Sequence, residues 1–277
     1  MKDDFENLLK LLDDDNEQLV SIAMAELLKR SGDRLNELLR SLQESPDMKF
    51  RRRIHQLQNA IESRRRRSFI AEKFRSDDLS LTDGMIYLHL LWFDNDTLEE
   101  MTEQWNQFLE SFRKLREPKT LPRLLKCLSG EITIYTDPGD PENPEVLCVG
   151  TVLESGIATD YMGCIIARLL SAYWGFETDV ISHQGDFFIH YQGSVYAPRT
   201  GWSPLPQADL QQKTFRRWKD SELISLLSYS LFTDAVATDS FRYIHTLGSC
   251  IGQRENPDFL PYPYGNDTLD QSSPGEE

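Results

Sequence analysis

The chain has 277 residues, of which 39% are hydrophobic and 27% are charged, and this composition is typical of a folded globular protein. Its formal net charge is −15, with 45 acidic against 30 basic residues, which disfavours binding to nucleic acids and to anionic membranes. No uninterrupted apolar run is long enough to cross a bilayer, so we expect no membrane-spanning segment.

The beginning of the chain and its cysteines are typical of a cytoplasmic protein. The opening residues, MKDDFENLLKLLDDDNEQLV, interrupt every apolar run with acidic side chains, so we expect neither a signal peptide nor a transit peptide. The cysteines form no CxxC pair and have no zinc-type spacing with the five histidines, so we expect no metal and no other cofactor. Reduced, buried thiols are the expected state of all four cysteines, Cys127, Cys148, Cys164 and Cys250.

Leucine-rich segments near the N-terminus predict two consecutive helical hairpins. Residues 8–33 form a helix, an acidic turn and a second helix, because apolar side chains recur at three- and four-residue spacing. The turn, DDDNE, supplies a cap and N-terminal carboxylates for the second helix. Residues 34–63 repeat the pattern, so we expect a short stack similar to HEAT repeats, although its period of roughly 30 residues is shorter than theirs.

Seven arginines lie along the last of these predicted helices and at its C-terminal end. One interpretation is a stripe that binds an anion or RNA, and the other is a solvated face that pairs with the chain's excess of acidic residues. No aromatic residues are interleaved to stack on bases, which favours the second interpretation. The seven residues are Arg51, Arg52, Arg53, Arg64, Arg65, Arg66 and Arg67.

The rest of the chain predicts an α+β fold. Helical periodicity dominates residues 77–114, and a loop dense in proline, aspartate and glycine, TDPGDPENPE, follows a strand-like ITIY. A long helical run, TDYMGCIIARLLSAYWGF, then leads to antiparallel strands, and this order indicates the α+β class. Residues 220–256 predict two more helices, whereas the final DTLDQSSPGEE lacks apolar anchors and is expected to be flexible.

The segment GDFFIHYQGSVYAPRTG predicts a β-hairpin whose two-residue turn is Gln192–Gly193, with glycine supplying a positive φ. This turn pairs Tyr191 with Ser194, and counting back along both strands places Asp186 opposite Arg199. We therefore expect an ion pair between Asp186 and Arg199. A carboxylate held by a guanidinium group stays ionised and is a poor general base.

Two segments in this order, SGIATDYMGCIIARLL and then QGDFFIHYQGSVYAP, resemble the transglutaminase-like core and, more narrowly, the bacterial SirB-type family. The resemblance covers residues 128–201 and implies helical repeats before the core and tetratricopeptide-like helices after it. The regions expected are helical repeats at 1–68, helices packing on the core at 69–126, the transglutaminase-like core at 127–210, a C-terminal helical hairpin at 211–258 and a flexible tail at 259–277.

The resemblance also locates the three positions that a catalytic triad would occupy. In active transglutaminase-like enzymes, a cysteine at the start of the helix is the nucleophile, a histidine on the next strand transfers the proton, and an acid on the following strand orients that histidine. Carried over onto this chain, the three positions fall on Ala158, Asp186 and Ala197. None of them has the group that the reaction needs, so the resemblance implies a protein without this triad.

Nearby residues offer poor substitutes. Cys164 lies six residues beyond Ala158, about 9 Å along the helix, and its apolar neighbours indicate a buried structural thiol. Thr159 is better placed to cap the helix than to act as a nucleophile. His183 and His190 are more typical of hydrogen-bonded strand histidines than of catalysts.

We therefore interpret the chain as a catalytically inactive transglutaminase-like protein that acts as a protein-interaction, scaffold or regulatory module for a protein or peptide partner. Its expected binding groove lies between the helix start and the hairpin and comprises Gly156, Thr159, Asp160, Asp186, His190 and Arg199. The alternative is a hydrolase or acyltransferase with relocated catalytic residues, for which Thr159, His183 and Asp186 are the candidates. A third interpretation is an anion or RNA binder that uses the seven arginines.

Overall fold

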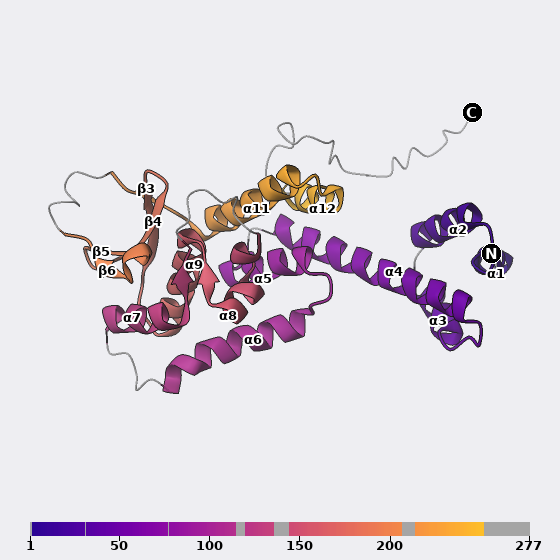
Figure 1. The fold of residues 1–277 in the computed structure, drawn as a ribbon, viewed down its shortest axis with the longest axis horizontal. Coiled ribbons are helices and arrows are strands. Elements are labelled where there is room, and N and C mark those ends of the chain that lie inside the picture. Colours follow the sequence, from indigo (N-terminus) through magenta and orange to yellow (C-terminus); the bar gives the residue numbers. More distant parts are fainter. Residues whose placement is uncertain are drawn as a thin grey trace, which may run out of the picture. The chain divides into compact units, whose positions relative to one another are not determined.

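The computed structural model describes residues 2–30, 32–76, 78–114, 120–135, 144–206 and 214–251. Over these ranges the fold is mostly helical α+β, with eleven α-helices and a five-stranded antiparallel sheet in the middle region (Figure 1). The predicted α+β class is confirmed. The chain divides into two compact units, residues 1–70 and 71–277, and the expected flexible tail at 259–277 lies outside the described residues.

The first unit is helical. Its helices are α1 (Lys2–Leu11), α2 (Glu17–Lys29), α3 (Asp33–Leu42) and α4 (Met48–Arg75), and the division between the units falls within α4. The acidic turn caps α2 as predicted, because the Asn16 side chain accepts a hydrogen bond from the backbone N–H of Gln18 at 3.0 Å. Apolar side chains from all four helices form one core, which includes Leu12, Leu27, Leu39, Ile54 and Leu57.

One of the seven arginines is a structural part of this unit. The Arg53 side chain is 3% exposed, and it donates hydrogen bonds to the backbone oxygens of Leu12 and Asp14, both at 2.7 Å. A third bond reaches the Glu17 carboxylate at 2.6 Å. Arg53 therefore satisfies carbonyl groups at the end of α1 and does not belong to an exposed stripe.

Two of the other arginines also make contacts within this unit. Arg64 donates to the backbone oxygen of Leu28 at 3.1 Å, and the Arg65 guanidinium lies 3.8 Å from the Asp33 carboxylate. The Arg65–Asp33 contact is an ion pair of the kind that the solvated-face interpretation expects, whereas the Arg64 contact is a hydrogen bond to the backbone.

We predict that replacing Arg53 with methionine lowers the free energy of unfolding by roughly 2 kcal/mol or more, because one buried and one partly buried carbonyl oxygen lose a charged donor. Urea unfolding followed by circular dichroism measures the change. The matched control is Arg52→Met, at an exposed position of the same helix, for which we expect a change of less than about 0.5 kcal/mol. Equal losses in the two variants would contradict the structural role of Arg53.

The helices of the second unit surround a buried central helix, α5 (Leu81–Trp92). Ten of the twelve residues of α5 are buried, as expected for a helix that is apolar on every side. An added Cβ at Gly84 would lie 2.7 Å from Ile224, so glycine permits the close packing of α5 and α11. The other helices are α6 (Leu98–Ser111), η1 (Phe112–Lys114), α7 (Leu121–Glu131), η2 (Pro144–Leu147), α8 (Val149–Ser155), α9 (Asp160–Tyr173), α11 (Asp220–Ala237) and α12 (Phe241–Ile251).

The five-stranded sheet has the order β6-β5-β4-β3-β7, and every neighbouring pair is antiparallel. Its strands are β3 (Asp179–His183), β4 (Asp186–Tyr191), β5 (Ser194–Ala197), β6 (Ser203–Pro204) and β7 (Arg216–Arg217). Helix α9 packs against β4 (Figure 1). The Tyr161 and Phe187 rings lie 5.6 Å apart at this contact. A separate parallel pair joins β1 (Thr133–Ile134) to β2 (Ile157–Ala158).

The predicted hairpin register is confirmed. Gln192 and Gly193 form the turn, with φ values of 47° and 79°, and Tyr191 pairs with Ser194. Strand β5 ends at Ala197, however, and Arg199 lies in a short 3-10 turn, η3 (Pro198–Thr200). The proline at the first position of η3 starts this turn, because it donates no backbone hydrogen bond to a strand.

None of the helices in the described ranges combines the length and the apolar character that crossing a bilayer requires.

Candidate functional site

The start of α9 and the hairpin meet at one end of the sheet. Ala158 is the last residue of β2, two positions before α9, while Asp186 begins β4 and Ala197 ends β5. The Asp160 carboxylate, in the first turn of α9, accepts the backbone N–H of Phe187 at 3.4 Å. This contact joins the helix start directly to the first strand of the hairpin.

Arg199 lies between two carboxylates at this end of the sheet. Its guanidinium is 3.3 Å from the Asp186 carboxylate and 3.1 Å from that of Asp160. The predicted Asp186–Arg199 ion pair is therefore confirmed, although Arg199 reaches it from η3 and not from a strand. The second pair, with Asp160, was not predicted, because it depends on how the helix packs on the sheet.

The two carboxylates differ in environment. The Asp186 side chain is 53% exposed, whereas that of Asp160 is 8% exposed. Burial raises the pKa of Asp160, and the Arg199 charge and the backbone N–H groups of Phe187 and Tyr161 oppose this increase. Arg199 thus compensates for placing a carboxylate inside the fold.

The possible nucleophiles near this site are already engaged or buried. The Thr159 hydroxyl caps α9 as predicted, because it accepts the backbone N–H of Met162 at 3.3 Å, and the residue is 5% exposed. Cys164 is completely buried, and burial raises the pKa of its thiol well above the ordinary value. Burial likewise raises the pKa of the Cys148 thiol, and that of Cys250 to about 12. All four cysteines are free, and Cys127 is half-buried.

The two strand histidines make separate contacts. His183 pairs in register with Asp186, but its Nδ1 is 3.0 Å from the backbone oxygen of Thr214. His190 lies four residues along β4 from Asp186, about 13 Å away at about 3.3 Å per residue. Its Nδ1 is 3.5 Å from the Asp179 carboxylate. Because the two residues are four apart on one strand, their side chains point to the same face of the sheet, and the expectation that both belong to one groove stays a prediction.

Gly156, another residue of the expected groove, has a conformational role. It ends α8 with a φ of 69°, and an added Cβ would lie 2.8 Å from the backbone oxygen of Glu131. Its own backbone oxygen accepts the N–H of Thr133 at 2.7 Å. Gly156 therefore brings the chain from α8 into β2 alongside β1.

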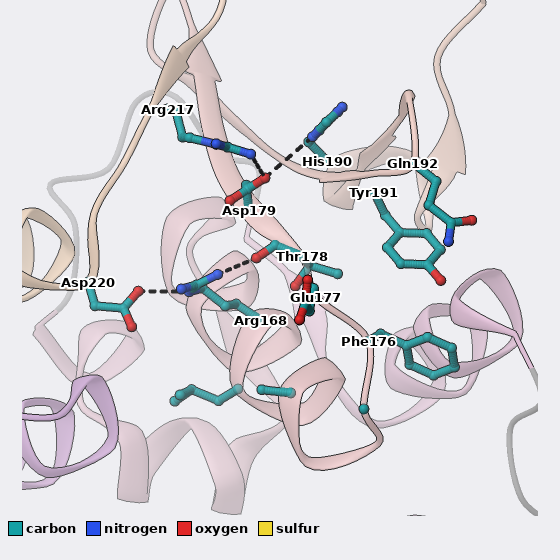
Figure 2. Close-up of a pocket in the computed structure, with 13 residues that line it drawn as sticks. Arg168, Phe176, Glu177, Thr178, Asp179, His190, Tyr191, Gln192, Arg217 and Asp220 are labelled. Carbon is teal, nitrogen blue, oxygen red and sulfur yellow. Dashed lines mark hydrogen bonds and ion pairs between the residues drawn. The ribbon is translucent and has the colours of Figure 1, made fainter.

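A cavity of about 730 Å³, here called the Glu177 cavity, opens at the other end of the sheet (Figure 2). Sequence reasoning did not identify it, because its walls come from α9, the segment after α9, β3, β4, β7 and α11. One signal was available: Arg168 is a basic residue in an otherwise apolar stretch of α9. The polar and aromatic side chains that line the Glu177 cavity include Arg168, Phe176, Glu177, Asp179, Tyr191 and Arg217.

A second cavity, of about 530 Å³, is lined by a buried histidine that the sequence reasoning also missed. His89 is 2% exposed, and its Nε2 lies 2.8 Å from the Asp96 carboxylate. Its Nδ1 is buried without a hydrogen-bond partner in the described part of the chain. Gly150 makes room for the ring, since an added Cβ would lie 2.5 Å from the imidazole Cε1.

Comparison with known proteins gives no relative to guide the assignment. No family profile, curated protein or solved structure matches this chain. Among the described residues, no group of three or more histidine, cysteine, aspartate or glutamate side chains is arranged to hold a metal ion.

We predict that Arg199→Met destabilises the protein by about 1–2 kcal/mol at pH 7, because the buried Asp160 carboxylate loses its ion-pair partner. Removing the guanidinium raises the pKa of Asp160 further, so the loss should shrink as the pH is lowered from 7 to 4 and the carboxyl becomes protonated. Urea unfolding at both pH values measures this difference.

The control for this test is Asp186→Asn, which removes the exposed partner of the same guanidinium and should cost about 0–1 kcal/mol. An equal loss for Arg199→Met at pH 7 and pH 4 would show that Asp160 is not the residue affected.

We predict that His89 makes the fold sensitive to acid. Burial lowers the pKa of His89, and the opposing effects of Asp96 and Glu154 are smaller. The unfolded chain therefore binds a proton more readily than the folded one, so stability is lost as the pH falls below about 6.5. The variant His89→Gln should lose less stability than the natural chain between pH 7.5 and 5.5 in urea unfolding, and an unchanged pH dependence would contradict this role.

Proposed function

We propose that this protein is a non-catalytic, SirB-type transglutaminase-like protein that binds a protein or peptide partner as a scaffold or regulatory module in the bacterial cytoplasm. One observation carries the proposal. The helix start and the two hairpin strands converge, while the positions of the expected triad hold Ala158, Asp186 and Ala197.

The architecture supports this proposal in two respects. The paired helices of the first unit, α1 with α2 and α3 with α4, agree with the HEAT-like repeats that the resemblance implies. Helices α11 and α12 pack side by side after the sheet, as a tetratricopeptide-like hairpin would (Figure 1). Stacked helical hairpins of these kinds commonly present surfaces to protein partners.

The chemistry of the site supports binding more than catalysis. A nucleophilic thiol must ionise, and the nearest thiol, Cys164, is buried with a raised pKa. A general base must be free to accept a proton, but Asp186 is held by Arg199 and the His183 ring contacts the Thr214 carbonyl. Thr159 would supply the nucleophilic hydroxyl of the alternative hydrolase, but this hydroxyl caps α9.

The same end of the sheet offers groups that a peptide could contact. Arg199 and Asp186 are both about half exposed, so a partner can reach one positive and one negative side chain. Ile157, next to Ala158, is an apolar side chain that is 40% exposed. Polar groups around an exposed apolar residue are a common arrangement in protein interfaces.

We predict that the purified protein reacts with neither thiol-directed nor hydroxyl-directed activity probes at the proposed site. Peptide mapping after incubation with iodoacetamide and with a fluorophosphonate probe should find no stoichiometric label on Thr159 or Cys164, which are both buried. Because Cys127 is half-buried, modification there serves as an internal reference for ordinary thiol alkylation. Stoichiometric labelling of Thr159 or Cys164 would favour the hydrolase or acyltransferase alternative.

Partner binding can be tested by photocrosslinking in cells. A photoreactive amino acid at Ile157 should form crosslinks to a polypeptide, and these should weaken when Arg199 is replaced by glutamate. The matched control is Tyr173, which is similarly exposed at the far end of α9, with 38% against 40% for Ile157. Equal crosslinking at the two positions, or no effect of the Arg199 variant, would contradict a binding surface at the start of α9.

A further inference from the structure

The Glu177 cavity is separate from the site at the start of α9. It lies where α9 ends and β3 begins, and its lining includes His190 and Tyr191 at the end of β4, whereas Asp186 stands at the beginning of that strand. Its volume of about 730 Å³ falls in the range of cavities that hold small organic groups, about 300–1,000 Å³.

Among the described residues, the charged groups of the cavity leave one carboxylate without a partner. The Arg168 guanidinium donates to the Asp220 carboxylate at 2.7 Å and to the backbone oxygen of Thr178. Arg217 forms an ion pair with Asp179. The lining thus holds two guanidinium groups and three carboxylates, and the third carboxylate belongs to Glu177. Glu177 is exposed and makes no hydrogen bond or ion pair with the described residues.

The part of the cavity away from the ion pairs is aromatic. Figure 2 shows the Phe176 and Tyr191 rings on one side and the Arg168–Asp220 and Arg217–Asp179 pairs on the other. The two rings are in an edge-to-face arrangement with centroids 5.9 Å apart. The amide of Gln192, in the hairpin turn, adjoins them. Aromatic faces next to a carboxylate are a favourable environment for an organic cation.

An anionic ligand fits this arrangement less well. Each guanidinium already contacts a carboxylate of the cavity wall, so an anion would have to compete with Asp220 or Asp179. It would also approach the negative charge of the Glu177 carboxylate. A cation would meet no such competition, because the positive groups are already neutralised by their partners.

We propose that the Glu177 cavity binds an organic cation, an ammonium or guanidinium group, through the Glu177 carboxylate and the rings of Phe176 and Tyr191. The group comes either from a free small molecule or from a basic side chain of a polypeptide, and the same chemistry recognises both. This binding site is additional to the proposed function and does not depend on it, since Glu177, Phe176 and Tyr191 are not among the residues of the groove expected at the start of α9.

A titration of the full-length, ¹⁵N-labelled protein followed by NMR tests the proposal. The probes are agmatine, a blocked Gly-Gly-Arg-Gly-Gly peptide, and the same peptide with neutral citrulline in place of arginine. We expect the two cations to shift backbone amides between Gly175 and Gln192, and the citrulline peptide to leave them unchanged. Tighter binding of the arginine peptide than of agmatine would assign the cation to a polypeptide, and the reverse would assign it to a small molecule.

Two variants give the decisive comparison. Glu177→Gln should weaken cation binding about tenfold or more, because an ionic hydrogen bond becomes a neutral one. Glu131→Gln, at an exposed position at the end of α7 and outside the cavity, should bind as the natural chain does. The NMR spectrum of each variant reports directly whether it remains folded.

Three results would overturn the proposal. They are equal binding of the arginine and citrulline peptides, unchanged affinity in Glu177→Gln, and stronger shifts of the same amides by inorganic phosphate. Absence of crosslinks at Ile157 would contradict the proposed function without affecting cation binding. The two experiments therefore test the two proposals separately.

Discussion

The buried carboxylate of Asp160 fixes the geometry of the region around the start of α9. It needs donors to compensate for its burial, and it finds them in the Phe187 N–H and the Arg199 guanidinium. One donor belongs to β4 and the other to η3, so satisfying one side chain brings a helix, a strand and a turn together. The site at the start of α9 is therefore held by polar contacts as well as by the apolar packing of α9 on the sheet.

The two ends of the sheet suit different chemistry. At the start of β4, Arg199 links two carboxylates, and both of its charge interactions are made within the protein. At the far end of β4, two separate ion pairs neutralise the arginines, and the Glu177 carboxylate stays exposed in a cavity that the Phe176 and Tyr191 rings also line. The first arrangement holds the helix start, strand and turn together and leaves Arg199 and Asp186 partly exposed. The second arrangement suits recognition of a positively charged group.

Local signals in the sequence were sufficient to predict the hairpin and one ion pair, between Asp186 and Arg199. The Gln192–Gly193 turn determines its own strand register, because a two-residue turn allows one pairing, and this register placed Asp186 near Arg199. A cap from the DDDNE turn, which is Asn16 in the structure, and a cap at Thr159 were also predicted, since a cap depends on neighbouring residues.

Contacts between distant segments could not be predicted in this way. Arg53 has the same local signature as the exposed arginines around it, and only the packing of α4 on the end of α1 buries it. The Glu177 cavity is assembled from residues 168 to 220, and no spacing in the sequence indicates that Arg168 meets Asp220. His89 likewise lies in an apolar helix, and its partner Asp96 comes from the following loop.

The position of Arg199 has an evolutionary consequence. One guanidinium contacts two carboxylates, Asp160 and Asp186, that come from different elements and lie 26 residues apart in the sequence. A substitution at 199 alone leaves a negative charge inside the fold, while a neutral residue at 160 removes the need for the arginine. Positions 160 and 199 should therefore change together among descendants of this sequence, and exposed position 186 should drift more freely.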